Sequence, residues 1–220
     1  MPARNRKTGQ RRIDDVFARA NAIGKDFGAF TEAFYNRHVG DDEMAYEPEA
    51  LVESARIAWA AIESYRPGKS YVDVKPTSPV MREGKPVAVV TVINENMPFL
   101  FDSVMGEIND MSHHVRLVVH PVLDVKHHGP DFELVERSPG GMTEDGAIRT
   151  SVIHVMREDL TDETAKALEE SLAGIISQVR AAVRDWRTMV ARVDASMNDL
   201  RTQILFPYTT LFRSDRKSVV

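Results

Sequence analysis

Cysteine is absent from this sequence, and its absence excludes several kinds of chemistry. Among the 220 residues there is no thiol, so disulfides, thiolate nucleophiles and cysteine-ligated zinc or iron–sulfur sites cannot form. No apolar run approaches the about 20 residues that span a bilayer, and the N-terminus lacks the apolar segment of a signal peptide. The sequence therefore predicts a cytoplasmic protein with no membrane partner.

An excess of positive charge is also missing. The chain has 28 lysines and arginines against 33 aspartates and glutamates, a formal net charge of -5, so its composition favours no nucleic-acid partner. The N-terminal "RNRKTGQRR" is basic but carries no aromatic residue. We expect residues 1–10 to form a disordered basic tail.

The motifs of common catalytic and cofactor sites are lacking as well. The sequence contains no H-E-x-x-H, G-x-S-x-G, P-loop or G-x-G-x-x-G, and "SPGG" lacks the following lysine or helix start of a phosphate-binding loop. Adjacent histidines, as in the pairs at 113–114 and 127–128, point to opposite faces of an extended strand and do not chelate a metal together. We predict no catalytic residue, no cofactor and no metal site in this chain.

What the sequence does contain is the hydrophobic pattern of an α+β fold. Residues 11–68 place apolar side chains at three- and four-residue steps, which indicates helices. Residues 71–75 alternate as a half-buried strand, and residues 87–93 are almost all β-branched, as in a strand buried on both faces. Residues 115–125 and 147–157 also favour strands, but Pro121 requires a bulge or an edge position.

Two helices complete the pattern. The first has Asn96 as a plausible N-cap and Pro98 in its first turn. Its apolar face is formed by Leu100, Val104, Ile108 and Met111. The second begins after Thr161, a good N-cap, and its stripe is formed by Leu168, Leu172, Ile175, Val179, Val183, Trp186, Val190 and Val193. This helix is longer than a small α/β core is wide, so its far half should dock on the N-terminal helices, another subunit or a following domain.

The order of these elements predicts the domain organisation. Residues 69–186 read as strand, strand, helix, strand, strand, helix, which indicates a mostly antiparallel, ferredoxin-like unit with helices on one face. Residues 187–204 would extend the long helix toward a missing next domain. Residues 205–220 have no apolar period and resemble translated adapter sequence, so we expect a disordered or artefactual tail.

The candidate ligand site is the polar segment "NENMP" between the strand at 87–93 and the following helix. The first N–H groups of a helix attract anions, so a carboxylate-bearing small molecule would fit there. We assign candidate ligand-binding residues at Asn94, Asn96, Met97 and Asp102. The alternative is that Asn96 only caps the helix and Asn94 only satisfies the turn.

These residues also carry a resemblance to a known family. The stretch "INENMPFLFDSVMGEINDMSHHVRLVVHPVLDVKHHG", with "SVIHVMRED" and the long helix after it, resembles the N-terminal region of the large bacterial NAD-specific glutamate dehydrogenases, which contains ACT-like modules of βαββαβ type. The resemblance covers roughly residues 29–200. Its most specific elements are the N-x-N-M-P-F-L-x-D-S-V segment and the "HPV" of the next strand.

The resemblance implies a function for the whole enzyme rather than for this chain. The family deaminates glutamate oxidatively to 2-oxoglutarate and ammonia, with NAD as the parent enzyme's cofactor, in a distant C-terminal domain that this chain lacks. No catalytic or NAD-binding residue carries over, and we expect the chain alone to be inactive. It would be a truncated regulatory or assembly fragment whose partners are an amino-acid effector and either the remainder of the parent chain or further copies. The alternative is a stand-alone ACT-type module that binds an amino acid. The last strand of an ACT-like unit would be the segment at 71–75, or missing.

Overall fold

A computed structural model describes residues 2–35, 45–111, 114–129, 131–135 and 145–210. The chain divides into two compact units, Met1–Ser177 and Gln178–Val220. These units do not follow the predicted boundaries at 68/69 and 186/187, because the N-terminal helices share a hydrophobic core with the sheet. Within the described residues, no helix is long and apolar enough to cross a membrane.

Three helices come first in the chain, as predicted. They are α1 (Pro2–Ile23), α2 (Lys25–Tyr35) and α3 (Pro48–Ser64). Because α1 already begins at Pro2, the prediction of a disordered tail is wrong for residues 2–10. Arginine, lysine and glutamine are good helix formers, and a helix grows outward from its packed part without a new nucleation step.

The ends of α3 are set by local chemistry. Pro48 occupies the first turn, where its missing N–H leaves no helical hydrogen bond unmade. At the other end, Arg66 Nη1 donates to the carbonyl oxygens of Glu63 at 2.6 Å and Tyr65 at 2.7 Å. These hydrogen bonds satisfy carbonyls that the helix itself leaves free.

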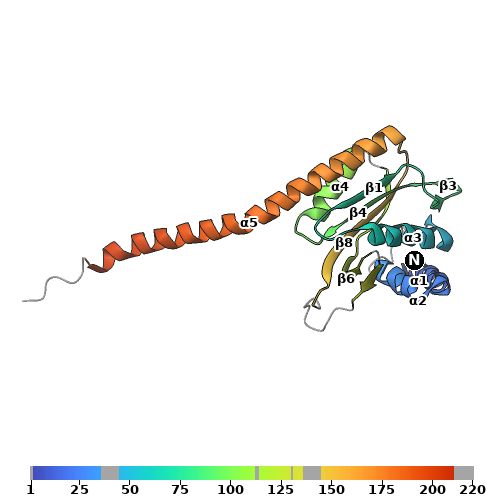
Figure 1. Ribbon diagram of the computed structural model, residues 1–220, viewed down its shortest axis with the longest axis horizontal. Coiled ribbons are helices and arrows are strands. Elements are labelled where there is room, and N and C mark those ends of the chain that lie inside the picture. Colours follow the sequence, from blue (N-terminus) through green and yellow to red (C-terminus); the bar gives the residue numbers. More distant parts are fainter. Residues whose placement is uncertain (1, 36–44, 112–113, 130, 136–144, 211–220) are drawn as a thin grey trace, which may run out of the picture. The chain divides into compact units, whose positions relative to one another are not determined.

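The main sheet is antiparallel at every pairing among the described strands (Figure 1). It contains β1 (Tyr71–Lys75), β4 (Ala88–Glu95), β5 (Val115–Val119), β6 (Val122–His128), β7 (Asp131–Leu134) and β8 (Ile148–Arg157). The strand order is β1-β4-β8-β6-β7, and β5 also pairs with β8. A separate hairpin is formed by β2 (Met81–Arg82) and β3 (Lys85–Pro86).

This topology confirms the ferredoxin-like α+β prediction. The unit runs β4, α4 (Leu100–Met111), β5 and β6, β8, then α5 (Asp162–Thr210). In such a unit the last strand lies antiparallel beside the first. Here β1 takes that position, with Tyr71 opposite Ile93 and Lys75 opposite Val89 on β4. Of the two alternatives, the strand at 71–75 therefore completes the sheet.

The two helices of the ferredoxin-like unit, α4 and α5, pack on one face of the sheet as predicted, and the N-terminal helices α1–α3 cover the other face. Val90 and Val92 of β4 pack in a core with α4 and the first part of α5, whereas Val89 and Ile93 pack in a core with α1, α2 and α3. Successive residues of a strand point to opposite faces. Because β4 is buried at every position except Glu95, it requires a covering layer on each side.

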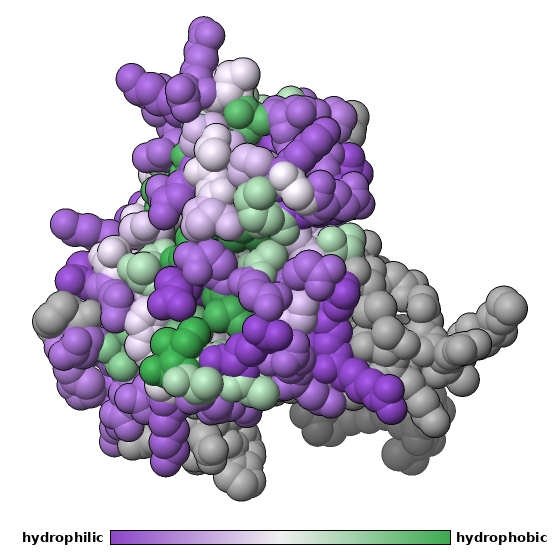
Figure 2. Space-filling view, turned by 90° about the vertical axis from the view of Figure 1, so that its right-hand side faces the viewer, coloured by the Kyte–Doolittle hydropathy of each residue, from purple (hydrophilic) through white to green (hydrophobic). Residues whose placement is uncertain are grey.

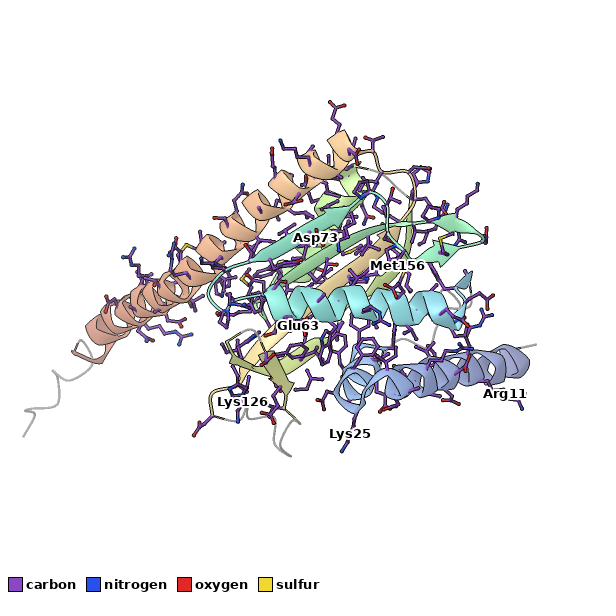
Figure 3. All side chains as sticks on the ribbon, turned by 45° about the vertical axis from the view of Figure 1, so that its right-hand side comes forward. Arg11, Lys25, Glu63, Asp73, Lys126 and Met156 are labelled. Carbon is purple, nitrogen blue, oxygen red and sulfur yellow. The ribbon has the colours of Figure 1, made fainter. Side chains whose placement is uncertain are left out.

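Figure 3 draws the side chains between the sheet and the helical layers. Figure 3 labels Met156 on β8, a buried residue of the core beneath α1–α3, and Glu63 on α3, which covers that face. Figure 2 shows one face of the molecule, on which hydrophilic residues predominate and hydrophobic ones occur in small patches.

Proline interrupts the long strand after α4, as its lack of an N–H requires. Strands β5 and β6 lie one after the other along the same edge of β8, with Val119 opposite His154 and Val122 opposite Ser151. Between them Pro121 makes no ladder donation, but its carbonyl oxygen accepts a hydrogen bond from Val152 N at 3.0 Å. The register therefore continues across the break.

The two later helices follow their predicted stripes only in part. On α4, Leu100, Val104 and Ile108 are buried as predicted, but Met111, its last residue, is 41% exposed. Thr161 caps α5 as expected, because its Oγ1 accepts a hydrogen bond from Thr164 N at 3.2 Å.

Helix α5 contributes to the core only in its first part. Its buried residues there are Ala165, Leu168, Leu172 and Ile176. Within the second unit, an apolar stripe on the same helix is 39–57% exposed; we call it the α5 stripe, and it comprises Trp186, Met189, Val190, Val193, Met197 and Leu200. The helix continues to Thr210, where helix growth adds one hydrogen bond per residue, so the prediction of disorder is wrong for residues 205–210. The alternative, that this segment is artefactual, stays a prediction. Residues 211–220 lie outside the described residues.

One histidine lies wholly inside the core between α3 and the sheet. His154 of β8 is 0% exposed, with its Nε2 3.0 Å from Ser54 Oγ and its Nδ1 3.0 Å from Thr91 Oγ1. A neutral imidazole carries one N–H and one bare nitrogen, so one hydroxyl donates to it and the other accepts. Burial, with a smaller effect of Lys75, lowers the pKa of His154 to about 3.

This depressed pKa predicts acid sensitivity. In the unfolded chain the histidine pKa is about 6.5, so between that value and about 3 only the unfolded state binds the proton. Stability is fully present above pH 6.5 and should fall as the pH is lowered, by about 1.4 kcal/mol per unit. Urea unfolding of the wild type and His154→Gln from pH 7 down to about 5 should show a flatter profile in the variant. An unchanged slope, like that expected for the exposed control His128→Gln, would contradict this assignment.

Candidate ligand site at the β4–α4 elbow

The elbow consists of the four residues between β4, which ends at Glu95, and α4, which begins at Leu100. Phe99 immediately precedes the helix with a positive φ of 65°, and its carbonyl oxygen accepts a hydrogen bond from Ser103 N at 3.0 Å. Phe99 therefore holds the N-cap position, and the prediction that Asn96 caps the helix is wrong. The chain uses Pro98 and Phe99 as a turn to change direction, so the helix starts later than the sequence pattern indicated.

Two hydrogen bonds fix the elbow to the rest of the sheet. Asn96 N donates to Arg149 O at 2.7 Å, which extends the pairing with the β8 side beyond β4. Glu95 Oε1 accepts a hydrogen bond from Gly68 N at 2.9 Å. Gly68 has a φ of 82°, a left-handed conformation that favours glycine, in the turn between α3 and β1.

A cluster of polar and aromatic side chains lies at the base of the elbow. Asn94 is 1% exposed, donates from Nδ2 to Glu95 O at 2.7 Å, and lies opposite Ser151 in the ladder. Ser151 Oγ is 2.8 Å from His120 Nε2, and the His120 ring stacks on Phe101 with centroids 4.4 Å apart. We call Asn94, Ser151, His120 and Phe101 the elbow cluster.

The elbow cluster joins residues that sequence reasoning did not bring together. His120 is half-buried and lies where Pro121 interrupts the strand. Its contact with Ser151 depends on the register of β8 against β5 and β6. The only sequence signal was the "HPV" of the resemblance, which marks the strand but not its partner.

The predicted site residues have different environments. Asn94 is buried and Met97 packs partly against the core of α4 and α5. Asn96 and Asp102 are exposed, and Asp102 lies in the first turn of α4. The first N–H groups of a helix lack helical acceptors and attract a carboxylate, while the Asp102 carboxylate attracts a cation. The elbow therefore has the charge pattern for a ligand that carries both charges.

Other features of the described residues offer less chemistry. A cavity of about 530 Å³ lies between the start of α3 and the β2–β3 hairpin; its carboxylates are Glu47, Glu49, Glu53 and Glu83. Each of these glutamates pairs with an arginine, respectively Arg12, Arg19, Arg56 and Arg82. No group of three or more histidine, aspartate or glutamate side chains in the described ranges is placed to hold a metal ion.

The remaining histidines do not form a site in the described part of the chain. His127 packs against Tyr65, with ring centroids 5.5 Å apart, and burial, aided by Arg66 and His128, lowers its pKa. His128 is exposed. His113 and the "SPGG" turn at 138–141 lie outside the described residues.

The described strands differ from those of a doubly wound dinucleotide-binding sheet. A dinucleotide binds where the carboxyl ends of parallel strands meet helix N-termini. Every pairing among the described strands is antiparallel, so these residues provide no crevice of that type.

The fold and the elbow define an ACT-like unit: β4, α4, β5 with β6, β8 and α5, completed by β1 at the sheet edge. A family model described as the glutamate dehydrogenase ACT1 domain matches residues 30–172, more than half of the chain. The chain belongs to this family. No curated protein and no solved structure matches it.

The elbow geometry makes a prediction for two neighbouring asparagines. Asn94→Ala removes a buried hydrogen bond and should lower the free energy of unfolding by about 1–3 kcal/mol. Asn96→Ala removes an exposed side chain that caps no helix and should change it by less than about 0.5 kcal/mol. Urea unfolding of both variants measures the difference. A loss of about 1 kcal/mol or more in Asn96→Ala would restore its role as a cap.

Proposed function

We propose that this chain is the N-terminal regulatory and assembly region of a cytoplasmic NAD-dependent glutamate dehydrogenase. The observation that supports this is the match to the glutamate dehydrogenase ACT1 domain, which runs from α2 through the whole sheet into α5. The parent enzyme would use NAD to deaminate L-glutamate to 2-oxoglutarate and ammonia. That chemistry would occur in another part of the parent protein.

The regulatory role would depend on an amino-acid effector at the elbow. Its carboxylate would meet the first N–H groups of α4, its ammonium would meet Asp102, and Asn94, Asn96 and Met97 would line the site. Support comes from the N-terminus of α4, whose first N–H groups have no acceptor within the helix, and from the exposed Asp102 carboxylate in its first turn. Binding there would act on α4 and, through the elbow cluster, on β5, β6 and β8.

A thermal-shift screen of proteinogenic amino acids tests this proposal. At about 100 times its Kd, an effector should raise the unfolding midpoint by roughly 5 °C or more. Asp102→Asn should reduce the rise because it removes the carboxylate that meets the ammonium, whereas Asp110→Asn, on the same helix, should preserve it. If no amino acid shifts the midpoint, the elbow binds no effector. The same chain should form no NADH from glutamate and NAD, and NADH formation would contradict a purely regulatory role.

A stand-alone module that binds an amino acid and acts through a partner is the second candidate. The elbow cluster favours this second candidate, because all four residues of the cluster belong to this chain. Sequencing the source gene across the codon for Val220 and beyond distinguishes the two candidate functions. Continuation into a dehydrogenase domain supports the regulatory region, and a stop codon directly after Val220 supports the stand-alone module.

The assembly role would depend on the α5 stripe. In the parent enzyme it would pack against the rest of the protein or another subunit, because large apolar surfaces on a soluble helix mark contact sites. In isolation the chain should self-associate through the same residues.

Light scattering should therefore show association of the isolated chain that decreases in Val193→Lys. Ala195→Lys, which adds the same charge outside the stripe, should leave the mass unchanged. A monomeric wild type, or equal effects of both variants, would remove the basis for an assembly surface on this helix.

A further inference from the structure

The end of the β4–β8 pair opposite the elbow contains a second group of charged residues. The elbow adjoins Glu95 opposite Thr150, while the other end has Ala88 opposite Arg157. The β2–β3 hairpin lies just before β4 in the chain, and the next two residues after β8 are Glu158 and Asp159.

The hairpin has a tight turn that fixes two cations side by side. Glu83 and Gly84 have φ values of 51° and 77°, and two successive positive φ values are typical of the turn that joins two-residue hairpins. Arg82 and Lys85 flank this turn and lie opposite each other in the ladder. Residues opposite each other in a ladder project from the same face.

The hairpin is held to the body of the protein. Val87 N donates to Val80 O at 3.0 Å, and Ser78 Oγ donates to Val87 O at 2.6 Å. Val80 and Val87 are buried. The two cations are therefore presented by an anchored element.

Glu158 links the hairpin to β5. Its carboxylate accepts hydrogen bonds from Arg82 Nη1 at 2.6 Å and from Arg116 Nη2 at 2.7 Å, and its backbone N donates to His114 O at 3.1 Å. The hydrogen bond from Arg116, with a further one from Arg82, lowers the pKa of Glu158. Both oxygens of this carboxylate are already engaged, so Glu158 positions the two arginines.

A cavity of about 360 Å³ lies among these groups; its charged lining residues are Arg82, Glu83, Lys85, Arg116, Glu158 and Asp159. This volume is in the range of small-molecule sites, about 300–1,000 Å³. Among the described residues, no carboxylate forms an ion pair with Lys85. The Asp159 side chain is 77% exposed, and its Oδ2 lies 3.8 Å from His114 Nδ1.

We infer that this cavity binds an α-amino acid or a similar small zwitterion, with its carboxylate at Lys85 and Arg116 and its ammonium at Asp159, while Glu83 pairs with Arg82 at 3.4 Å. Three cations and three anions line the walls, so a simple anion such as phosphate would meet repulsion from Asp159 and Glu83. A zwitterion meets an opposite charge at each end. The site is separate from the elbow and does not rest on the proposed function.

Calorimetric titration of the 220-residue chain with each proteinogenic amino acid tests the inference. At least one should bind, and both Lys85→Met and Asp159→Asn should weaken that binding about tenfold or more, the loss expected for one charge-assisted contact. Lys166→Met and Asp110→Asn, which remove exposed charges elsewhere, should leave the affinity unchanged. Unfolding midpoints without ligand confirm that each variant is folded.

Two comparisons separate this site from its alternatives. Asp102→Asn at the elbow should not weaken binding here; if it abolishes all binding while Lys85→Met has no effect, the inference is overturned even though the elbow proposal stands. Inorganic phosphate is the second probe. Phosphate binding that depends on Lys85, without amino-acid binding, would show an anion site and refute the zwitterion assignment, as would the absence of any binding.

Discussion

The pairing of β4 with β8 is the constraint on which the rest of this structure depends. The two strands pair without a register shift from Ala88 opposite Arg157 to Glu95 opposite Thr150, and nearly all their residues are buried. A central pair that is apolar on both faces is stable in water only when both faces are covered. Helices α4 and α5 provide one layer and α1–α3 provide the other, while β1 completes the edge that the ACT-like order leaves open.

Coverage of both faces leaves the ends of the strands for function. At one end the elbow presents a helix terminus and Asp102 beside the elbow cluster, in which Asn94 and Ser151 are buried and His120 and Phe101 are half-buried. At the other end Glu158 holds Arg82 and Arg116 beside a charged cavity. The polar His154 inside the core is not a third site, because Ser54 and Thr91 satisfy both of its ring nitrogens.

The sequence predicts the elements better than their contacts. Strand β4 and helix α4 follow from residue spacing, and the interruption at Pro121 follows from the missing N–H. The N-cap predicted at Asn96 is wrong, because the residue pattern of this segment does not reveal that Phe99 adopts a positive φ. The contacts of the elbow cluster depend on the register of β8 against β5 and β6. The spacing of residues within one segment does not reveal that register. A second helical layer was implied by the strand pattern of residues 87–93, which is typical of burial on both faces. The helices predicted at residues 11–68 were assigned to a separate segment, although they form that layer.

The central claim is that α1–α3 and the sheet form one unit held by β4 and β8. Native-state hydrogen exchange across residues 11–177 tests it most directly. The account predicts that the slowest amides of α3 exchange with the free energy of global unfolding, within about 1 kcal/mol of those of β4 and β8. If α3 amides exchange through an opening several kcal/mol lower in free energy while β4 and β8 stay protected, the N-terminal helices are a removable layer and the claim is contradicted.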